Sequence, residues 1–218
     1  MQGHPVLTDE LLAAALPPDP KPDLSARSPR FFRRPLFEAL TRAHPASPYV
    51  LHLPLVALAL WLARPLPPAA LVALVLAGAL VWTFIEYWLH RGFFHMRADT
   101  PARRVTSYIV HRHHHHAPAD PDRIAATPLY SLGLLALLFA VYTLAGPHAR
   151  FALLAGTALG YLAYELLHWR LHHPAPRADP RLLTALRRHH LRHHHGDGRS
   201  NFGISSPLWD LVLRTYRA

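Results

Sequence analysis

Long apolar runs alternate with basic, histidine-rich segments along this chain of 218 residues. Four apolar stretches stand out, at residues 49–63, 66–85, 128–145 and 151–164. The second and third contain roughly 18 to 20 uncharged residues, the length that a helix needs to cross the hydrocarbon core of a bilayer. The first and fourth are shorter, and each by itself would equally fit a helix buried in a soluble core.

The connections between these stretches favour a membrane protein. ARPLPP joins the first two stretches and AGPHAR joins the last two, so each pair indicates a tight helical hairpin. A short span can tilt less or thin the bilayer locally. The pattern predicts an all-α integral membrane protein with four transmembrane helices arranged as two hairpins. Residues 1–47 would form an N-terminal cytoplasmic or interfacial segment, and residues 48–218 the membrane domain.

The positive charges predict the orientation of these helices. The N-terminal segment, the stretch 91–123 and the C-terminal segment carry 6, 6 and 9 Lys and Arg residues, whereas the two hairpin turns carry one each, Arg64 and Arg150. Cytoplasmic loops are enriched in Lys and Arg, so both termini and the central stretch are expected in the cytoplasm. Only one of the 23 basic residues is Lys, and Ala, Leu and Pro abound, as in a GC-rich bacterial gene. We therefore expect a bacterial cytoplasmic membrane.

The composition also excludes several kinds of protein. The chain contains no Cys, which rules out disulfides, thiolate–zinc sites and thiol nucleophiles within it. Its first residues, MQGHPVLTDE, lack the charged and apolar regions of a signal peptide. A net charge of +10 is compatible with nucleic-acid binding. However, no basic stretch is free of the histidine-rich segments or the membrane edge, so we expect no nucleic-acid partner.

Two histidine-rich segments share one spacing. In RRHHLRHHHGDGRSNFGIS, His190, His193 and His194 lie at i, i+3 and i+4, on one face of an α-helix. Asp179 and Pro180 predict the N-cap and first position of that helix, and Gly196 its end. The same spacing recurs in VHRHHHHAPADPDR, at His111, His114 and His115. The other histidines in or beside the motifs are expected to be bystanders: His113, His116, His173, His189 and His195.

A histidine pair ends one apolar stretch in each half of the sequence. EYWLHRGFFH contains His90 and His95, and YELLHWRLHH contains His168 and His172. The second pair lies at i and i+4 on one face, whereas the first pair is about 140° apart on an ideal helix. The helix must therefore distort, and we expect the distortion at Gly92. Each half thus offers five imidazoles, in a loose repeat offset by 78 to 79 residues.

Ten imidazoles in this arrangement predict a site for two metal ions, held by a cytoplasmic helical cap on the four spans. Imidazole is the commonest neutral metal ligand and suits iron, zinc, copper and nickel. An unpaired carboxylate near the end of an apolar span is costly, so we expect Glu86 and Glu165 to accept hydrogen bonds from imidazole N–H groups. Pairing of these carboxylates with Arg at the interface is the alternative. The predicted metal ligands are His90, His95, His111, His114, His115, His168, His172, His190, His193 and His194.

Four motifs carry a resemblance to a known family. LHRGFFH, HRHHHHAPADPDR, GYLAYELLHWRLHH and HHLRHHHGDGRSNFGISSPLWD closely resemble the fatty acid hydroxylase family of membrane enzymes, and within it the fatty acid 2-hydroxylase branch. The resemblance covers about residues 31 to 212, including RFFRRPLFEALTR, which is similar to an interfacial lead-in before the first span. Asn201 departs from the pattern, because relatives often have Gly there.

The resemblance implies a dimetal centre, expected to be di-iron, that uses O₂ to insert oxygen into a C–H bond of an acyl chain. Zinc could also occupy an all-imidazole site. A pocket between the spans would accept a long-chain acyl substrate from the bilayer and place its C2 atom near the metals. Electrons are expected from a separate donor protein, because residues 1–47 are too few for the cytochrome b5 domain of some relatives and GHPVL is not its haem-binding signature.

The substrate head group is the least constrained part of this interpretation. Arg123 and the loop from Phe202 to Ser205 are the candidates, since a guanidinium binds a carboxylate or phosphate. Arg123 is alternatively an ordinary positive charge of a cytoplasmic loop.

Other functions remain open. A sterol desaturase-type oxidase or a carotenoid ring hydroxylase shares the histidine motifs, although AP-x-D and FGIS…LWD favour acyl 2-hydroxylation. A membrane metal transporter or buffer belongs to a different class. Transporter sites usually lie near the bilayer midplane, whereas these histidines gather at one face.

Overall fold

The computed structural model describes the chain except for residues 1–3, 18–22, 24–27, 174–178 and 197. The described residues form helices and their connections, with one isolated antiparallel bridge between Leu7 and Phe32. The predicted all-α fold class is thus confirmed. The α-helices are α1 (Asp9–Ala15), α2 (Pro35–Ala39), α3 (Ser47–Ala63), α4 (Pro68–Trp88), α5 (Pro101–Ser107), α6 (His113–His116), α7 (Pro128–Tyr142), α8 (Ala149–His172), α9 (Arg181–His195) and α10 (Leu208–Val212). They are accompanied by the π-helices η1 (Leu89–Phe94) and η2 (Tyr108–Arg112) and the 3₁₀-helix η3 (Thr143–Ala145).

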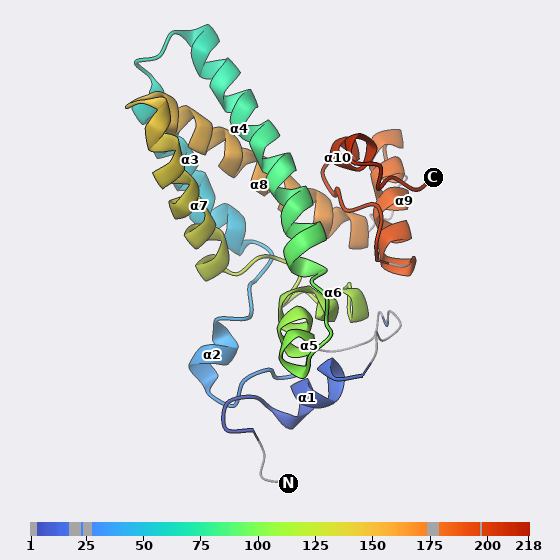
Figure 1. The fold of residues 1–218 in the computed structure, drawn as a ribbon. Coiled ribbons are helices and arrows are strands. Elements are labelled where there is room, and N and C mark those ends of the chain that lie inside the picture. The colour runs from blue at the N-terminus through green and yellow to red at the C-terminus, as the bar shows by residue number, and fades with distance from the viewer. Residues whose placement is uncertain (1–3, 18–22, 24–27, 174–178, 197) are drawn as a thin grey trace.

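Helices α3, α4, α7 and α8 lie together as a bundle (Figure 1). Three helices are long and apolar enough to cross a membrane: Pro68–Phe94, Pro128–Ala145 and Ala149–His172. The remaining one, α3, is a shorter apolar helix of 17 residues that contains Pro54. The helix that contains the fourth apolar stretch, α8, has 24 residues and continues beyond Tyr164 to His172, so the expected helical face of His168 and His172 is present. Four bundle helices are therefore present, and three of them have spanning length.

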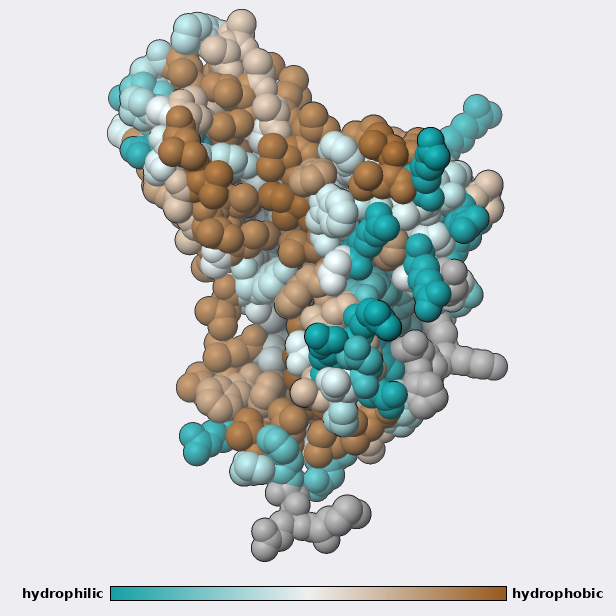
Figure 2. All heavy atoms as spheres, viewed as in Figure 1, coloured by the Kyte–Doolittle hydropathy of each residue, from teal (hydrophilic) through white to brown (hydrophobic). Residues whose placement is uncertain are grey.

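The outer faces of the bundle are apolar. Figure 2 shows hydrophobic side chains over these faces, whereas hydrophilic side chains gather over the part of the molecule around α5, α6 and α9. Large apolar side chains exposed on the bundle include Val50, Leu58, Trp61, Leu76, Leu80, Leu137 and Leu144. A second exposed apolar area lies on the short helix α2, at Leu36, Phe37 and Leu40. Such surfaces suit a bilayer rather than water.

Glycines let α4 and α8 approach closely. A Cβ atom on Gly156 would overlap the backbone of Val75, and a Cβ atom on Gly78 would overlap the backbone of α8. Thr157 Oγ1 donates a hydrogen bond to Gly78 O at 3.1 Å. Small residues at helix contacts are the usual means of close packing in membranes. This contact fixes the two helices whose ends carry the histidine pairs.

The helices α1, α2, α5, α6, α9 and α10 form what we call the cap, around the histidine-bearing ends of α4 and α8 (Figure 1). The N-terminal segment belongs to it, because Leu11 and Phe31 pack against Tyr108 in a buried apolar cluster. A cytoplasmic position for the cap remains a prediction from the charge pattern.

Candidate metal centre

The first histidine pair lies on a π-helix. η1 continues α4, and His95 N donates to His90 O at 3.1 Å, which is an i→i+5 bond. A π turn of this kind brings residues five apart onto one face, and such turns are frequent at functional sites. The predicted distortion between His90 and His95 is confirmed, and it includes Gly92.

The last histidine segment begins one residue later than predicted. α9 starts at Arg181 with Pro180 as its N-cap. The Asp179 carboxylate does not cap the helix; it pairs with Arg170 Nη2 at 2.7 Å and with Arg187. This ion-pair cluster ties the end of α8 to α9 and sets the rotation of the helix that carries three of the predicted ligands.

The ten predicted histidines gather in two groups of five. Within each group, one ring nitrogen per residue lies within 4.8 Å of the others. We call them the first group (His90, His95, His111, His115 and His193) and the second group (His114, His168, His172, His190 and His194).

Each group takes four histidines from one half of the sequence and one from the other. His193 Nε2 lies 2.9 Å from His95 Nε2 in the first group, and His114 Nε2 lies 2.9 Å from His168 Nε2 in the second. The internal repeat does not predict this exchange. His114 and His115 are adjacent in sequence, yet they point into different groups.

The donor set fits metal ions. Burial, reinforced by neighbouring imidazoles, lowers the pKa of His111 and His190 well below the ordinary value and that of His95 to about 2. These rings are therefore neutral at physiological pH. His172 Nε2 and His190 Nε2 face each other at 2.7 Å, and among the described residues neither ring nitrogen of His194 has a hydrogen-bond partner. Divalent cations are natural partners for several neutral nitrogens that converge in this way.

Backbone carbonyl groups orient two of the rings. His90 Nδ1 lies 2.6 Å from Phe202 O, and His193 Nδ1 lies 2.7 Å from Ser200 O. A carbonyl oxygen only accepts, so the proton is on Nδ1 and the Nε2 lone pair faces the first group. The loop after α9 thus fixes the tautomer of one ring from each half of the chain.

In the part of the chain that the structure describes, Glu86 and Glu165 bond groups other than imidazoles, contrary to the prediction. Glu86 accepts from Ile204 N at 2.5 Å, Ser205 N at 2.8 Å and Ser205 Oγ at 2.5 Å. Glu165 Oε1 accepts from Ala126 N at 3.0 Å. Both carboxylates are buried, and they anchor the loops that follow the histidine segments rather than the rings.

Two buried aspartates instead hold histidines that turn away from the groups. His113 Nε2 lies 2.8 Å from Asp120 Oδ2, and His189 Nε2 lies 3.2 Å from Asp210 Oδ2. All four side chains are buried, so His113 and His189 are structural residues rather than inert bystanders. Both aspartates lie in motifs that resemble the family, Asp120 in AP-x-D and Asp210 in LWD, but helical spacing did not predict their histidine partners. The other three off-face histidines are partly or fully exposed and lie outside both groups: His116, His173 and His195.

Arg123 is a structural residue and not a head-group contact, which corrects the prediction. Its side chain is 4% exposed, with the guanidinium carbon 3.6 Å from the centre of the Phe31 ring. It donates to Glu38 Oε1 at 2.7 Å and to Thr41 O at 2.9 Å. Because these partners belong to the N-terminal segment, Arg123 joins that segment to the loop after α6.

Phe202 and Ser205, the other residues predicted to contact the head group, likewise make structural contacts within the protein. The Ser205 hydroxyl donates to Glu86, and the Phe202 ring packs against His90, His95 and His193. The polar groups of Ser205 are already bonded within the chain, so this loop supports the first group rather than offering a polar grip to a substrate.

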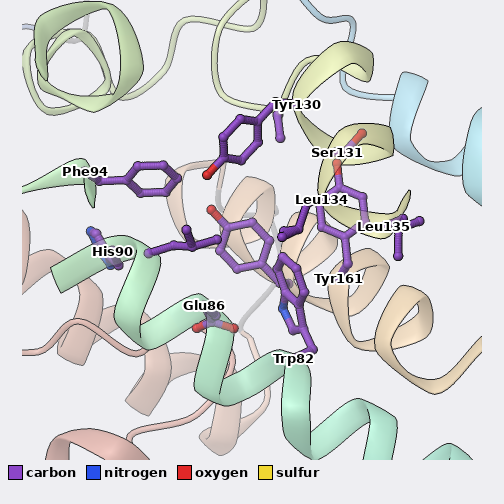
Figure 3. Close-up of a pocket in the computed structure, with 12 residues that line it drawn as sticks. Trp82, Glu86, His90, Phe94, Tyr130, Ser131, Leu134, Leu135 and Tyr161 are labelled. Atoms are coloured by element: carbon purple, nitrogen blue, oxygen red, sulfur yellow. The ribbon is translucent and has the colours of Figure 1, made fainter. Parts of the chain in front are cut away.

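An apolar pocket adjoins the first group (Figure 3). It has about 510 Å³ of empty space, and His90 and Phe94 line the side towards the histidines. Trp82 and Leu134 line its deeper part, and Tyr130 directs its hydroxyl into it. We call this space the inner pocket. Apolar walls with a few polar groups among them are typical of a small-molecule site.

The protein has apolar helices of spanning length and two histidine groups at one end of them. These features are those of a membrane protein that could hold metal ions. A family model described as fatty acid hydroxylase matches residues 75–215, more than half of the chain. The chain belongs to the fatty acid hydroxylase family, which confirms the resemblance seen in its motifs.

Individual relatives agree with this assignment. The chain is 33% identical to a dihydroceramide fatty acyl 2-hydroxylase of Arabidopsis thaliana, over 89% of this chain and 83% of the relative. It is 33% identical to the fatty acid 2-hydroxylase of Rattus norvegicus, over 68% of this chain but only 41% of the relative. A solved structure of full-length scs7p, in which only the hydroxylase domain is visible, superposes with a TM-score of 0.76. The sequence identity to it is 30%, over 84% of this chain and 70% of that chain.

Proposed function

We propose that the protein is an O₂-dependent fatty acid hydroxylase that acts at C2 of an acyl chain. The observation that carries this proposal is the position of the first histidine group at the wall of an apolar pocket, through His90. The relatives named for fatty acid and fatty acyl 2-hydroxylation support the position of attack. The AP-x-D and FGIS…LWD motifs favour this function over that of a sterol desaturase-type oxidase or a carotenoid ring hydroxylase.

Each histidine group would hold one metal ion, with the ten residues of the two groups as ligands. Two iron ions held there would supply the O₂ activation that an unreactive C–H bond requires. The chain's own residues present neutral nitrogens, fix ring orientation through Phe202 O and Ser200 O, and surround the reacting carbon with apolar walls. Trp82, Phe94 and Leu134 exclude water from the inner pocket. This exclusion would limit side reactions that compete with oxidation of the acyl chain.

The overall reaction also requires two electrons and two protons, because one atom of O₂ enters the product and the other leaves as water. We propose that a separate, acidic redox protein delivers the electrons at the outer face of α9. That face carries Arg188, Arg192 and His195 around an open groove, and α9 contains no acidic residue. The opposite face of the same helix carries His190 and His193, so only the width of one helix, about 10 to 12 Å, separates the donor from the metal ligands.

We further propose that the cap and both termini face the cytoplasm of a bacterial cell and that α3 completes a set of four spans. The charge bias supports the orientation, and the packing of α3 against α8 supports its membrane position. The N-terminal segment 1–47 would lie at the cytoplasmic interface, with the apolar side chains of α2 at the bilayer surface.

Mass spectrometry of fatty acids from expressing cells supplied with ¹⁸O₂ tests the function. Labelled 2-hydroxy acids are expected from the wild type and not from His193→Ala. A new double bond or a hydroxylated isoprenoid without any 2-hydroxy acid would assign the protein to another branch of the superfamily. Metal bound to the purified protein without any oxidised lipid would instead indicate a metal transporter or buffer.

A further inference from the structure

A second apolar space lies farther from the histidine groups along the bundle than the inner pocket does. It is a groove between α3, α7 and α8 with about 800 Å³ of empty space. Leu55, Leu58 and Leu132 form part of its lining, and these side chains are between 37% and 52% exposed. The groove therefore opens on the apolar outer face of the bundle. We call it the outer groove.

Leu135 lies where the two spaces meet. It is the residue that both linings share, and it is 9% exposed. Its side chain packs in a buried cluster with Val56, Ala59 and Ala155. Towards the histidines, its neighbour Leu134 packs instead with the cluster around Trp82. Leu135 on α7 thus lies on the boundary of both the inner pocket and the outer groove.

The two spaces are aligned along the bundle. On α8, Tyr164 lines the inner pocket and Phe151 lines the outer groove, a separation of about 20 Å at roughly 1.5 Å per residue. One leaflet contributes about half of the roughly 30 Å hydrocarbon core of a bilayer. The combined length therefore suits a long acyl chain, whereas the inner pocket alone receives only its first part.

We propose that the acyl chain of the substrate passes Leu135 from the inner pocket into the outer groove, so that Leu135 determines how well long chains are accepted. This inference rests on the proposed function. The methyl end of the acyl chain would lie in a groove that is lined by Leu, Val, Phe and Ala side chains and is open to lipid. Additional methylene groups of a longer acyl chain would therefore still be surrounded by apolar groups. An acyl chain is the occupant that fits, because both spaces are apolar and one end of the path reaches His90.

The matched variants Leu135→Trp and Leu137→Trp test the inference. Leu137 is on the same helix but faces outward and is 62% exposed. Each variant is produced as the full chain in cells fed with lauric, palmitic or lignoceric acid, and the 2-hydroxy products are measured. Leu135→Trp should lower the ratio of 2-hydroxylignoceric to 2-hydroxylauric acid by about a hundredfold, the loss that misplacement of a reacting carbon produces. Leu137→Trp should leave the ratio unchanged.

Leu132→Trp keeps the test decisive if Leu135→Trp fails to fold. Leu132 lines only the outer groove and is 37% exposed, so a larger ring there obstructs the groove without disturbing the inner pocket. It should lower the same ratio in the same direction. Equal losses for all three acids, or unchanged ratios in every folded variant, would overturn the inference. Absence of 2-hydroxy acids from the wild type would instead overturn the proposed function.

Discussion

At the scale of single residues, a hydrogen bond from one imidazole nitrogen determines whether the other nitrogen of the ring has a lone pair available for a metal ion. His90 and His193 each place Nδ1 against a backbone carbonyl, so their Nε2 atoms point into the first group. Partners outside the ligand shell of a metal site typically contribute 10- to 100-fold to metal affinity. The loop that carries Ser200 and Phe202 is therefore as much a part of the site as the rings.

His193→Ala and His195→Ala form a matched pair on α9. His193 is 1% exposed and belongs to the first group, whereas His195 is exposed and belongs to neither. We expect the first variant to abolish hydroxylation and to lower bound metal, and the second to change neither, as measured by metal analysis of the purified protein. Equal losses in the two variants would show that the first group is not a metal site.

Asp210 on α10 links that helix to the loop that carries Phe202 and Gly203. Burial opposes its ionisation, but hydrogen bonds from His189, Thr215, Gly203 and Phe202 outweigh that effect and hold the pKa of its carboxyl below the ordinary value. A carboxyl with a lowered folded-state pKa stabilises the protein above its unfolded pKa, and the contribution is lost as pH falls through the folded value.

Asp210→Asn should therefore lower the free energy of unfolding at neutral pH by about 1 to 3 kcal/mol, because an amide cannot accept all of these bonds. Below about pH 4, where aspartate protonates, the difference from the wild type should shrink. Thermal unfolding in detergent across this pH range measures it, with Asp9→Asn as the exposed control. A difference that stays constant down to acid pH would contradict the ionised role of Asp210.

The ten grouped histidines were predictable because their spacing along helices is a local property. The roles of Glu86 and Arg123 were not predictable, because their partners lie far away in sequence. Glu86 bonds Ile204, 118 residues along the chain, and Arg123 bonds Glu38, 85 residues away. Spacing indicates which side chains share a face, but it does not indicate which loop will fold against that face.

At the scale of elements, an α-helix and a π-helix each place a pair of histidines on one face. His168 and His172 are four residues apart on the α-helix α8, whereas His90 and His95 are five apart on the π-helix η1. Both pairs face their groups. The sequence predicted the need for a distortion, since a five-residue spacing does not fit an α-helix. The four-residue spacing of His168 and His172 correctly predicted that the α-helix continues beyond Tyr164 to this pair.

Gly156→Ala and Gly133→Ala compare a close helix contact with an open one. A methyl group on Gly156 would overlap the backbone of Val75, whereas one on Gly133 would meet nothing within 4 Å. The first change should lower the unfolding temperature and the amount of correctly folded protein. The second should be neutral or stabilise the protein by up to about 1 kcal/mol, since alanine is the better helix former. Thermal unfolding in detergent separates them, and equal stability would show that α4 and α8 need no close approach.

At the scale of the whole molecule, the charge bias makes a prediction about orientation. Reporter fusions in the turn at Arg64 and after Ala218 should lie on opposite sides of the membrane, with the C-terminal fusion in the cytoplasm. An alkaline phosphatase and a fluorescent protein, each inserted at both sites, give complementary readings. If both sites report the same side, the arrangement of four spans in two hairpins is wrong.

The exchange of His114 and His193 between the two histidine groups also determines when, during synthesis of the chain, each group becomes complete. The first group lacks its fifth member until α9 has been synthesised, and the second group lacks both His190 and His194 until then. A nascent chain on the ribosome therefore contains no complete group while its earlier helices enter the membrane. A fragment that ends before Arg181 therefore carries neither complete group and should bind less metal than the whole protein.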